Sequence, residues 1–479
     1  MSAETPAPGS SEHLDLSVFA PYLVKTRWFG GKGRDFEVTG SRRIGRLGDG
    51  DPTLDVLLVE LTYADDGAHE LYQVPLSYYT EPQHRLDHAF VGWWEDPDLG
   101  WVHAYDALHD KQATGLWLRA FGAAASGTAE VGGLTFHRVP GEDVDLTAAG
   151  SLFSGEQSNS SVLYGDDSVL KIFRKVTPGP NPDITTHDAL TRAGSTHVAH
   201  LYGWVELVPE ADAGGGGLPT HLGMLQQFLR TATDGWDLAL TSVRDLYADP
   251  EVEAREAGGD FSGEAGRLGE ALREVHTTLH EQVPTDPASA PTPAAIATAM
   301  RTRLEAALPV VPGLAPHADR LRAAYDALGA LPRIDVQTVH GDLHLGQTLR
   351  TAAGWKIVDF EGEPAKTLAE RLLPDSPWRD VAGMLRSFDY APHAGERQRQ
   401  ESGDDEATDE RRRRGQEWSA RNQRYFLAAY AGGDLTAEQQ VLVDAYVADK
   451  AVYETVYETR NRPAWVEIPL AAVARIGAR

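Results

Sequence analysis

The stretch Val339–Pro364 gathers side chains whose types and spacing suit transfer of a phosphoryl group. It carries Asp342, Gln347 five positions later, and Asp359 near the end of the apolar run Trp355–Phe360. Such a reaction needs a carboxylate that accepts the proton of the attacking hydroxyl. It also needs oxygen ligands for Mg²⁺, which neutralises charge on the transferring group. Asp342, Gln347 and Asp359 together could supply these three groups.

The order of these residues matches a known arrangement, H-R-D-x-x-x-x-N followed by D-F-G in protein kinases. Here the pieces read His340–Asp342, Gln347 and Asp359–Glu361. The chain departs from the pattern by Gly for Arg, Gln for Asn and Glu for the last Gly. The distance from the acid to the amide is the same in both.

The histidines near this stretch allow a second interpretation. His340 and His344 lie four positions apart and could form a metal pair, but no third ligand is marked beside them. We interpret His340 as a hydrogen-bonding group of the loop and expect Asp380 to buttress the same loop. His276 and His280 are expected on the face of a helix.

A lysine within an apolar strand predicts the nucleotide site. Lys171 lies in the run Val169–Phe173, where a buried ammonium is costly unless an anion accompanies it. In a phosphoryl-transfer enzyme this lysine holds the ATP phosphates. Asp183 or Asp188, in the turn and helix that follow, could orient it.

The segments on either side of that strand complete the predicted ATP site. The loop Gly155–Ser161 precedes the strand, where a phosphate-covering loop belongs, but it has a single Gly. The side chains expected to assist its backbone N–H groups are Ser158, Asn159 and Ser160. Leu222–Leu229 is expected to join two lobes, and its backbone around Gln227 and Phe228 could meet adenine.

The elements that must position these residues fall into a β-rich half followed by a helical half. Strands are expected at Thr53–Ala64 and His69–Tyr79, joined by the turn Asp65–Gly67, and again between Leu134 and Lys175. Helices are expected at Gln112–Phe121, at Gly263–Gln282 and through a final block from Trp418 to Tyr457. We predict three regions, namely 1–90 (a small β-rich domain), 91–217 (completing an N-terminal lobe) and 218–479 (a helical C-terminal lobe). This order predicts a two-lobed α+β enzyme with an extra domain in front.

Composition excludes several classes of function. The 479 residues carry 44 Lys+Arg and 71 Asp+Glu, a formal charge of 44 − 71 = −27, which argues against nucleic acid or anionic membrane as partners. Because there is no cysteine, disulfides, thiolate metal sites and cysteine nucleophiles are excluded. We find no secretory signal or membrane span and expect a cytoplasmic protein. The charged stretch Glu396–Gly415 is predicted to be a solvated, mobile insertion.

The chain resembles the bacterial maltokinase family, with its glucosamine-phosphorylating relatives, within the aminoglycoside-phosphotransferase-like kinases. The matching stretches are EQSNSSV, VLKIFR, NPD, VHGDLHLGQ, DFEGEP, SPWRDVAGMLRSFDYA and DKAVYETVYETRNRPAW. RWFGGKGR and YQV resemble the cap domain that precedes the kinase lobes in this family. The resemblance implies a protein-kinase-like fold with an N-terminal cap, and ATP and Mg²⁺ as donor and cofactor. It implies that Asp342 is the base and that Gln347 and Asp359 bind Mg²⁺. By the same resemblance, Lys171 binds the ATP phosphates.

The acceptor should lie between Asp342 and the final helical block. The residues predicted to bind a sugar there are His344, Glu361, Trp418, Asn422, Tyr425 and Glu454, with Asp389, Tyr453 and Glu458 as further candidates. An aromatic such as Trp418 can stack on a sugar, and acids can hold hydroxyls or an ammonium. The alternative for this face is simple packing, because Tyr446, Tyr453 and Tyr457 have the spacing of a buried stripe.

The abundance of carboxylates favours an amino sugar, which is cationic at neutral pH. The predicted reaction is transfer of the γ-phosphate of ATP to glucosamine, giving glucosamine 6-phosphate. The alternative is a maltokinase that makes maltose 1-phosphate. Further alternatives are an aminoglycoside kinase and a non-catalytic nucleotide or sugar sensor. The expected partners are a small sugar and ATP, and the sequence does not indicate an oligomeric state.

Overall fold

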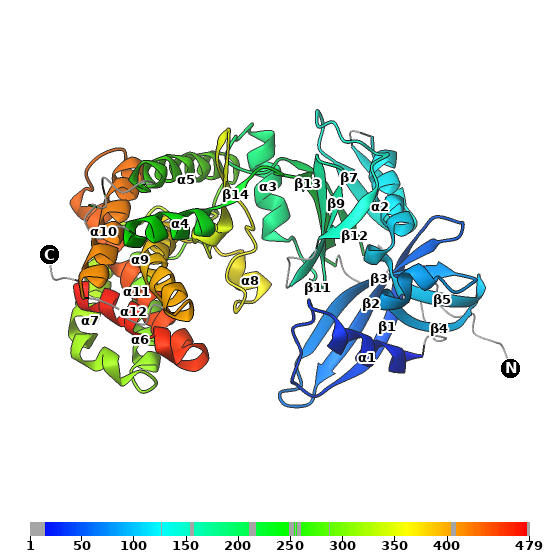
Figure 1. Cartoon of the computed structure of the whole chain (residues 1–479), viewed down its shortest axis with the longest axis horizontal. Coiled ribbons are helices and arrows are strands. Elements are labelled where there is room, and N and C mark those ends of the chain that lie inside the picture. The colour runs from blue at the N-terminus through cyan, green and yellow to red at the C-terminus, as the bar shows by residue number, and fades with distance from the viewer. Residues whose placement is uncertain are drawn as a thin grey trace. The chain divides into compact units, whose positions relative to one another are not determined.

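The structure, a computed structural model, describes residues 15–476 except 126, 154–157, 210–216, 249–252, 254, 256–259, 287 and 404–408. The chain divides into two compact units (Figure 1). The first comprises Met1–Asp188 and Ala199–Arg230, and the second comprises Ala189–Val198 and Thr231–Arg479. The chain therefore passes from one unit to the other at residues 188–189, 198–199 and 230–231.

The first unit begins with an antiparallel sheet whose strands run in the order β1-β2-β3-β5-β4. These are β1 (Phe36–Leu47), β2 (Thr53–Tyr63), β3 (His69–Tyr79), β4 (Phe90–Asp96) and β5 (Gly100–Asp106), and the short β11 (Lys175–Val176) also pairs with β3. Helix α1 (Phe19–Lys25) and the aromatic rings of Trp28 and Phe29 contribute to its core, where both rings pack on Tyr72. The predicted β-hairpin is confirmed. The predicted domain boundary at residue 90 falls at the start of β4, inside this sheet.

The second sheet of the first unit carries the predicted nucleotide lysine. Its order is β6-β7-β12-β13-β10-β9-β8. The strands are β6 (Thr128–Val131), β7 (Leu134–Arg138), β8 (Gly150–Phe153), β9 (Asn159–Tyr164), β10 (Ser168–Phe173), β12 (Leu201–Leu207) and β13 (Thr220–Gln227). Helix α2 (Lys111–Ala123) packs Trp117 and Phe121 against Phe136 of this sheet. Lys171 lies in β10, opposite Ser161 on one neighbour and Met224 on the other. Helix α3 (Pro182–Arg192) follows.

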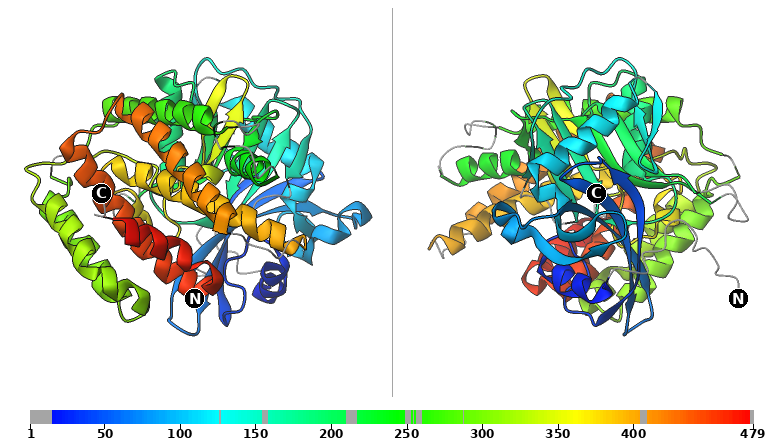
Figure 2. Two further views of the ribbon diagram at one scale, coloured as in Figure 1. Left: turned by 60° about the vertical axis from the view of Figure 1, so that its left-hand side comes forward. Right: turned by 90° about the vertical axis from the view of Figure 1, so that its right-hand side faces the viewer.

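The second unit is a helical assembly with a small sheet of β14 (Thr233–Asp234), β15 (Thr348–Thr351) and β16 (Gly354–Ile357). Its helices are α4 (Gly235–Ala248), α5 (Ser262–Gln282), α6 (Pro293–Ala307), α7 (Ala318–Gly329), α8 (Leu368–Arg371), α9 (Trp378–Glu401), α10 (Asp409–Ala431), α11 (Ala437–Asn461) and α12 (Glu467–Arg475). Helices α5 and α10 pack together, and α11 packs on α6, α7 and α9 (Figures 1 and 2). Their apolar faces enclose one continuous core.

Short 3₁₀ helices complete the described elements. They lie at Leu16–Val18, His84–Ala89, Ala107–His109, Pro312–His317, Leu345–Gln347 and Pro463–Trp465. None of the helices that the structure describes is both long and apolar enough to span a membrane. A β-rich N-terminal region followed by a helical C-terminal region is the architecture that the sequence predicted.

The charged stretch 396–415 corrects one expectation. Its first residues continue α9 as far as Glu401 and its last residues open α10 at Asp409, while residues 404–408 lie outside the described part. The charges of opposite sign pair along and between these helices, as in Arg397 with Glu401 and Arg411 with Glu396. Ion pairs three or four positions apart support a helix, so a run of mixed charge forms helix here where a mobile insertion was expected.

Candidate active site

The predicted catalytic loop is held by hydrogen bonds to the first turn of α9. The buried carboxylate of Asp380 accepts hydrogen bonds from the backbone N–H groups of His340 (2.7 Å) and Gly341 (2.8 Å). Gly341 adopts φ +84°, a conformation that favours glycine. The expectation that Asp380 buttresses the loop is confirmed.

Two histidines extend this support, and one was not expected to do so. The Nε2–H of His276, on α5, donates to Asp380 (3.0 Å), and its Nδ1 accepts from the hydroxyl of Tyr430 (2.9 Å). His340 donates from Nε2 to the carbonyl of Val358 (2.9 Å), so it is a hydrogen-bonding group of the loop, as predicted. Burial raises the pKa of Asp380, but these bonds outweigh it, and the pKa is lowered overall. A buried histidine on an amphipathic helix carries no sequence signal that separates this role from packing.

Arg379 is a second loop support that the sequence did not predict. Its guanidinium donates to the carbonyl of Gly341 (3.1 Å) and pairs with Asp375 (3.0 Å) and Glu363 (2.8 Å). One side chain thus ties the catalytic loop to the segment that follows Asp359. The signal that the sequence offered for this role was that Arg379 directly precedes Asp380.

Asp342 is partly buried and forms an ion pair with Lys450 of α11. The ammonium Nζ lies 3.1 Å from Oδ1 of the carboxylate. Burial raises the pKa of Asp342, but Lys450 and the neighbouring His344 and His340 lower it, and the net direction is downward. Lys450 was missed, although it is one of three lysines after residue 230, with Lys356 and Lys366.

The two predicted metal ligands lie together. The carboxamide of Gln347 donates from Nε2 to Oδ2 of Asp359 across 3.0 Å. Asp359 follows β16 with φ +66°, a conformation that costs energy for a residue other than glycine and that clusters at functional sites. The two side chains that were predicted to bind Mg²⁺ are thus within hydrogen-bonding distance of each other.

In the first unit, the structure selects Asp183 as the partner of the predicted ATP lysine. Lys171 Nζ lies 2.9 Å from Oδ2 of Asp183, and both side chains are buried. His187, one turn later on α3, donates from Nδ1 to the Asp183 carbonyl (2.8 Å) and lies 3.1 Å from its Oδ1. Burial raises the pKa of Asp183, but Lys171 and His187 lower it strongly. Of the two acids left open, Asp183 is therefore one that forms an ion pair with this lysine.

The predicted phosphate loop is only partly within the described residues. Gly155 lies outside them, while Ser158 is exposed and Asn159 and Ser160 are buried at the start of β9. The hydroxyl of Ser160 accepts from Nε of Arg174 (2.8 Å).

The segment predicted to meet adenine borders a cavity. Gln227 and Phe228 line a hollow of about 400 Å³ together with Tyr202 and neighbouring acids. Their backbone N–H groups donate to the carbonyls of His200 (2.8 Å) and Asp167 (2.9 Å). The backbone N–H groups of both residues therefore already donate hydrogen bonds within the protein.

The six predicted sugar-binding residues separate into different environments. His344 and Glu361 belong to the loop and to the turn after β16. Tyr425 is exposed on α10, with Arg421 and Arg424 over its ring. Glu454 is buried, and its carboxylate accepts from Arg386 at 2.8 Å.

Trp418 and Asn422 are core residues, which corrects their assignment to the sugar site. Trp418 is 1% exposed, packs on Phe261 and Phe388, and donates from Nε1 to Ser242. Asn422 is fully buried and donates to the carbonyl of Trp418. A ring without a free face cannot stack on a sugar. Residues that face the core and residues that face a binding site recur at the same helical spacing. The sequence pattern therefore could not tell the two positions apart.

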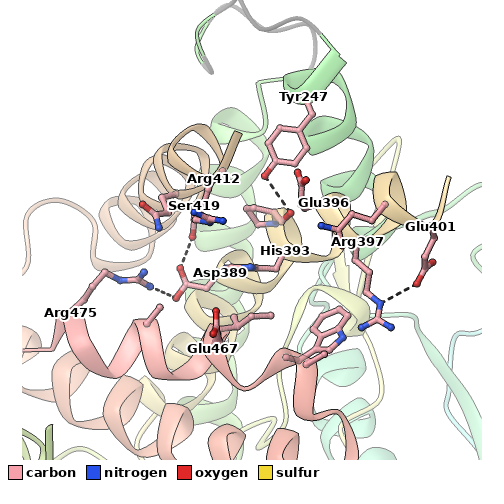
Figure 3. A pocket seen from close by; sticks show the side chains of 18 residues that line it. Tyr247, Asp389, His393, Glu396, Arg397, Glu401, Arg412, Ser419, Glu467 and Arg475 are labelled. Atoms are coloured by element: carbon pink, nitrogen blue, oxygen red, sulfur yellow. Dashed lines mark hydrogen bonds and ion pairs between the residues drawn. The ribbon is translucent and has the colours of Figure 1, made fainter. Parts of the chain in front are cut away.

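A cavity of about 630 Å³ lies between α9, α10 and α12 (Figure 3). In its wall Asp389 accepts from Ser419 (2.7 Å) and from Arg475 (2.7 Å). The same carboxylate pairs with Arg386, which holds Glu454 one turn beyond Lys450 on α11. Polar contacts thus connect this cavity with the helix that carries the partner of Asp342.

Family models match both parts of the chain. "Maltokinase N-terminal cap domain" matches residues 22–110, and "Phosphotransferase enzyme family" matches residues 229–440. The second match contains the catalytic loop, Gln347 and Asp359. Together with the braced loop, it defines a phosphotransferase of the kinase-like class.

Curated relatives and a solved structure narrow this class. A glucosamine kinase of Streptacidiphilus jiangxiensis is 31% identical over 332 residues, which cover 66% of this chain and 70% of the relative. A glucosamine kinase of Mycolicibacterium smegmatis is 30% identical over 249 residues, covering 49% of this chain and 57% of the relative. The structure of a glucosamine kinase in complex with glucosamine, ADP and inorganic phosphate shares the fold, with TM-score 0.67, 22% identity and 97% of each chain covered. The chain belongs to the maltokinase and glucosamine kinase family and is an ATP-dependent carbohydrate kinase.

Proposed function

We propose that the chain is a cytoplasmic enzyme that transfers the γ-phosphate of ATP to the 6-hydroxyl of glucosamine, with Mg²⁺ as cofactor. The observation that carries the proposal is the loop that Asp380 holds by two backbone N–H groups, with Asp342 on it and the Gln347–Asp359 pair beside it. A loop fixed in this way keeps a base in one place while the substrates come and go. Positioning of this kind supplies much of the catalysis in phosphoryl transfer.

In the proposed transfer, one bond to the γ-phosphorus forms as another breaks. The acceptor hydroxyl gives its proton to the carboxylate of Asp342 as its oxygen bonds to the γ-phosphorus. The bond from that phosphorus to the bridging oxygen of ADP breaks, and ADP leaves. Lys171, oriented by Asp183, is assigned to the ATP phosphates. Ser158, Asn159 and Ser160 are proposed to assist it.

The donor set next to Asp342 fits a magnesium ion. Gln347 uses its Nε2 toward Asp359, and its carboxamide oxygen has no hydrogen-bond partner among the residues that the structure describes. Amide and carboxylate oxygens are the ligands that Mg²⁺ prefers, together with phosphate oxygens. When bound, the ion would neutralise the charge of the transferring phosphoryl group.

Glucosamine is the acceptor that the relatives favour. Two curated relatives are glucosamine kinases, and carboxylates such as Glu361 lie close in sequence to the proposed metal ligands. An ammonium group is attracted to such a cluster, whereas a neutral disaccharide is not. Maltose is the alternative acceptor, because the first 110 residues contain the match to a maltokinase cap.

The test is an ADP-release assay with Mg²⁺ and ATP, run in parallel with glucosamine, maltose, glucose and kanamycin. We expect turnover with glucosamine, and ³¹P NMR should show a phosphate ester at carbon 6. Asp342→Asn should lower kcat by about 10²–10⁴-fold, whereas the exposed control Asp434→Asn should be unchanged. Turnover with maltose alone would overturn the choice of acceptor. Nucleotide binding without turnover on any acceptor would indicate a sensor.

A further inference from the structure

The base proposed above has a built-in counter-ion that comes from a distant part of the chain. Lys450 lies in the middle of α11, 108 positions beyond Asp342, and its Nζ lies 3.1 Å from Oδ1 of that carboxylate. The two side chains are 28% and 25% exposed, so the pair is partly shielded from water. At such a site an ion pair fixes the orientation of its members more firmly than at an open surface.

The surroundings of Lys450 direct its charge to Asp342. Along α11, its ammonium lies 5.3 Å from the centre of the Tyr453 ring, which packs beside it. The acids next to it on the same helix have other partners, because Asp449 pairs with Arg303 at 2.7 Å and Glu454 is engaged by Arg386 at 2.8 Å. Among the described residues, Asp342 is the carboxylate that forms an ion pair with Lys450.

The second oxygen of Asp342 is open. Oδ1 is the oxygen that accepts from Lys450, and no hydrogen bond to Oδ2 occurs among the described residues. The other charged or titratable groups that face this carboxylate are His344, His340 and the phenol of Tyr453, and Asp359 faces His344 in turn. One oxygen is held and one is free, which is the arrangement needed by a base that must receive a proton from a fixed direction.

We propose that Lys450 is a positioning residue that anchors Oδ1 of Asp342 and so leaves Oδ2 for the acceptor hydroxyl. This inference rests on the proposed function, in which Asp342 is the base. Without the ammonium, the carboxylate could rotate about its Cβ–Cγ bond, and a partly buried acid would be less stable in its ionised form. A misplaced base costs rate, because the reacting atoms must be aligned. The lowered pKa of Asp342 agrees with this role.

The experiment compares Lys450→Met, Lys450→Arg and the control Arg303→Met. Arg303 pairs with Asp449, the residue before Lys450, at 2.7 Å, so the control removes a different ion pair from the same helix. The acid limb of the pH profile of kcat/KM should move to higher pH in Lys450→Met and return toward the wild-type position in Lys450→Arg. We expect kcat to fall about 10- to 100-fold in Lys450→Met, with KM for ATP within about twofold of wild type. Arg303→Met should match wild type in both respects.

A second readout does not depend on turnover. In protein labelled with ¹³C at the aspartate carboxyl carbons, the Asp342 signal is assigned by its loss in Asp342→Asn and followed through a pH titration. Its midpoint should rise in Lys450→Met. An unchanged midpoint and an unchanged acid limb in folded Lys450→Met would overturn the inference. A wild-type chain without turnover on any acceptor would overturn the proposed function instead, and the titration would still decide whether Lys450 acts on Asp342.

Discussion

At the scale of single residues, two carboxylates with opposite capacities meet at the catalytic loop, Asp342 within it and Asp380 in α9. Asp380 accepts two backbone N–H groups and the imidazole of His276, so both of its oxygens are occupied. To take up a proton it would have to give up bonds that hold the loop. Asp342 has one oxygen engaged, by Lys450. The hydrogen bonds alone therefore separate the supporting acid from the one that can accept a proton.

Glu206 of β12 offers a pH test of a different carboxylate. His137 donates to it from Nε2 at 2.9 Å, and His221 lies 3.2 Å from its other oxygen. Burial raises the pKa of Glu206, but these two histidines outweigh it and lower the pKa to about 2. Because the folded pKa is depressed, the stabilisation is present above the ordinary glutamate value of about 4.5 and is lost as pH falls toward 2.

We therefore expect Glu206→Gln to lower the free energy of unfolding at pH 6 by on the order of 2 kcal/mol. The difference from wild type should shrink as pH is lowered from 6 to 3. Urea unfolding of both chains across this range measures it. Glu130→Gln, on the exposed side of β6, is the matched control and should follow wild type. A constant difference at all pH values would contradict the assignment.

At the scale of elements, the sequence was informative where the apolar pattern was strong. The expected helices at 112–121 and 263–282 correspond to α2 and α5, and the strands expected at 53–64 and 69–79 correspond to β2 and β3. The charged ends of α9 and α10 were missed because side-chain ion pairs, and not an apolar face, support them there. The loop residues Asp342, Gln347 and Asp359 could be found because chemistry fixes their spacing. Lys450 and His276 could not, since they reach the loop from remote helices.

The contact between α9 and the catalytic loop depends on a glycine. A Cβ added to Gly383 would lie 2.3 Å from the carbonyl oxygen of Leu343, closer than two such atoms can approach. Alanine within a helix is ordinarily favoured over glycine by about 1 kcal/mol. Here the backbone of the loop would have to move.

We expect Gly383→Ala to lower both the melting temperature and kcat, because the loop that carries Asp342 is displaced. Differential scanning fluorimetry and the ADP-release assay measure the two effects. The control is Gly266→Ala in α5, where the nearest atom would be 4.0 Å away, and it should preserve or raise the melting temperature. An active and more stable Gly383→Ala would show that α9 and the loop do not need this close approach.

At the scale of the molecule, one buried guanidinium ties the first sheet to the second within the N-terminal unit. Arg174, 1% exposed, follows β10 and pairs with Asp106 at the end of β5 (3.0 Å). It also donates to Ser160 of β9 and lies over the ring of Trp28, 4.4 Å from its centre. The strand β11 that follows pairs with β3. The RWFGGKGR stretch, whose purpose was not evident from the sequence, thus contributes an aromatic ring to this junction.

Removal of residues 1–110 should therefore leave the rest of the first unit without a cooperative unfolding transition, while the second unit keeps its own core. The truncation deprives Arg174 of Asp106 and β11 of its partner strand, and breaking a buried ion pair alone costs about 3–5 kcal/mol. Circular dichroism during heating tests this. The full-length variant Asp106→Asn, which loses the charge alone, should melt earlier but still cooperatively. A truncated chain that melts as sharply as the full chain would contradict the expectation.

The shared junction also limits how this protein could be recombined with its relatives. A chimaera that joins the cap of one sequence to the kinase lobes of another at residue 110 would separate Trp28 and Asp106 from Arg174 and β11, which lie far beyond the join. Whether the donor cap presents an acid and an aromatic ring to Arg174 would then decide whether the junction forms. Exchange of residues 174–176 together with the cap would keep the junction intact, although more than sixty codons separate these two portions of the gene.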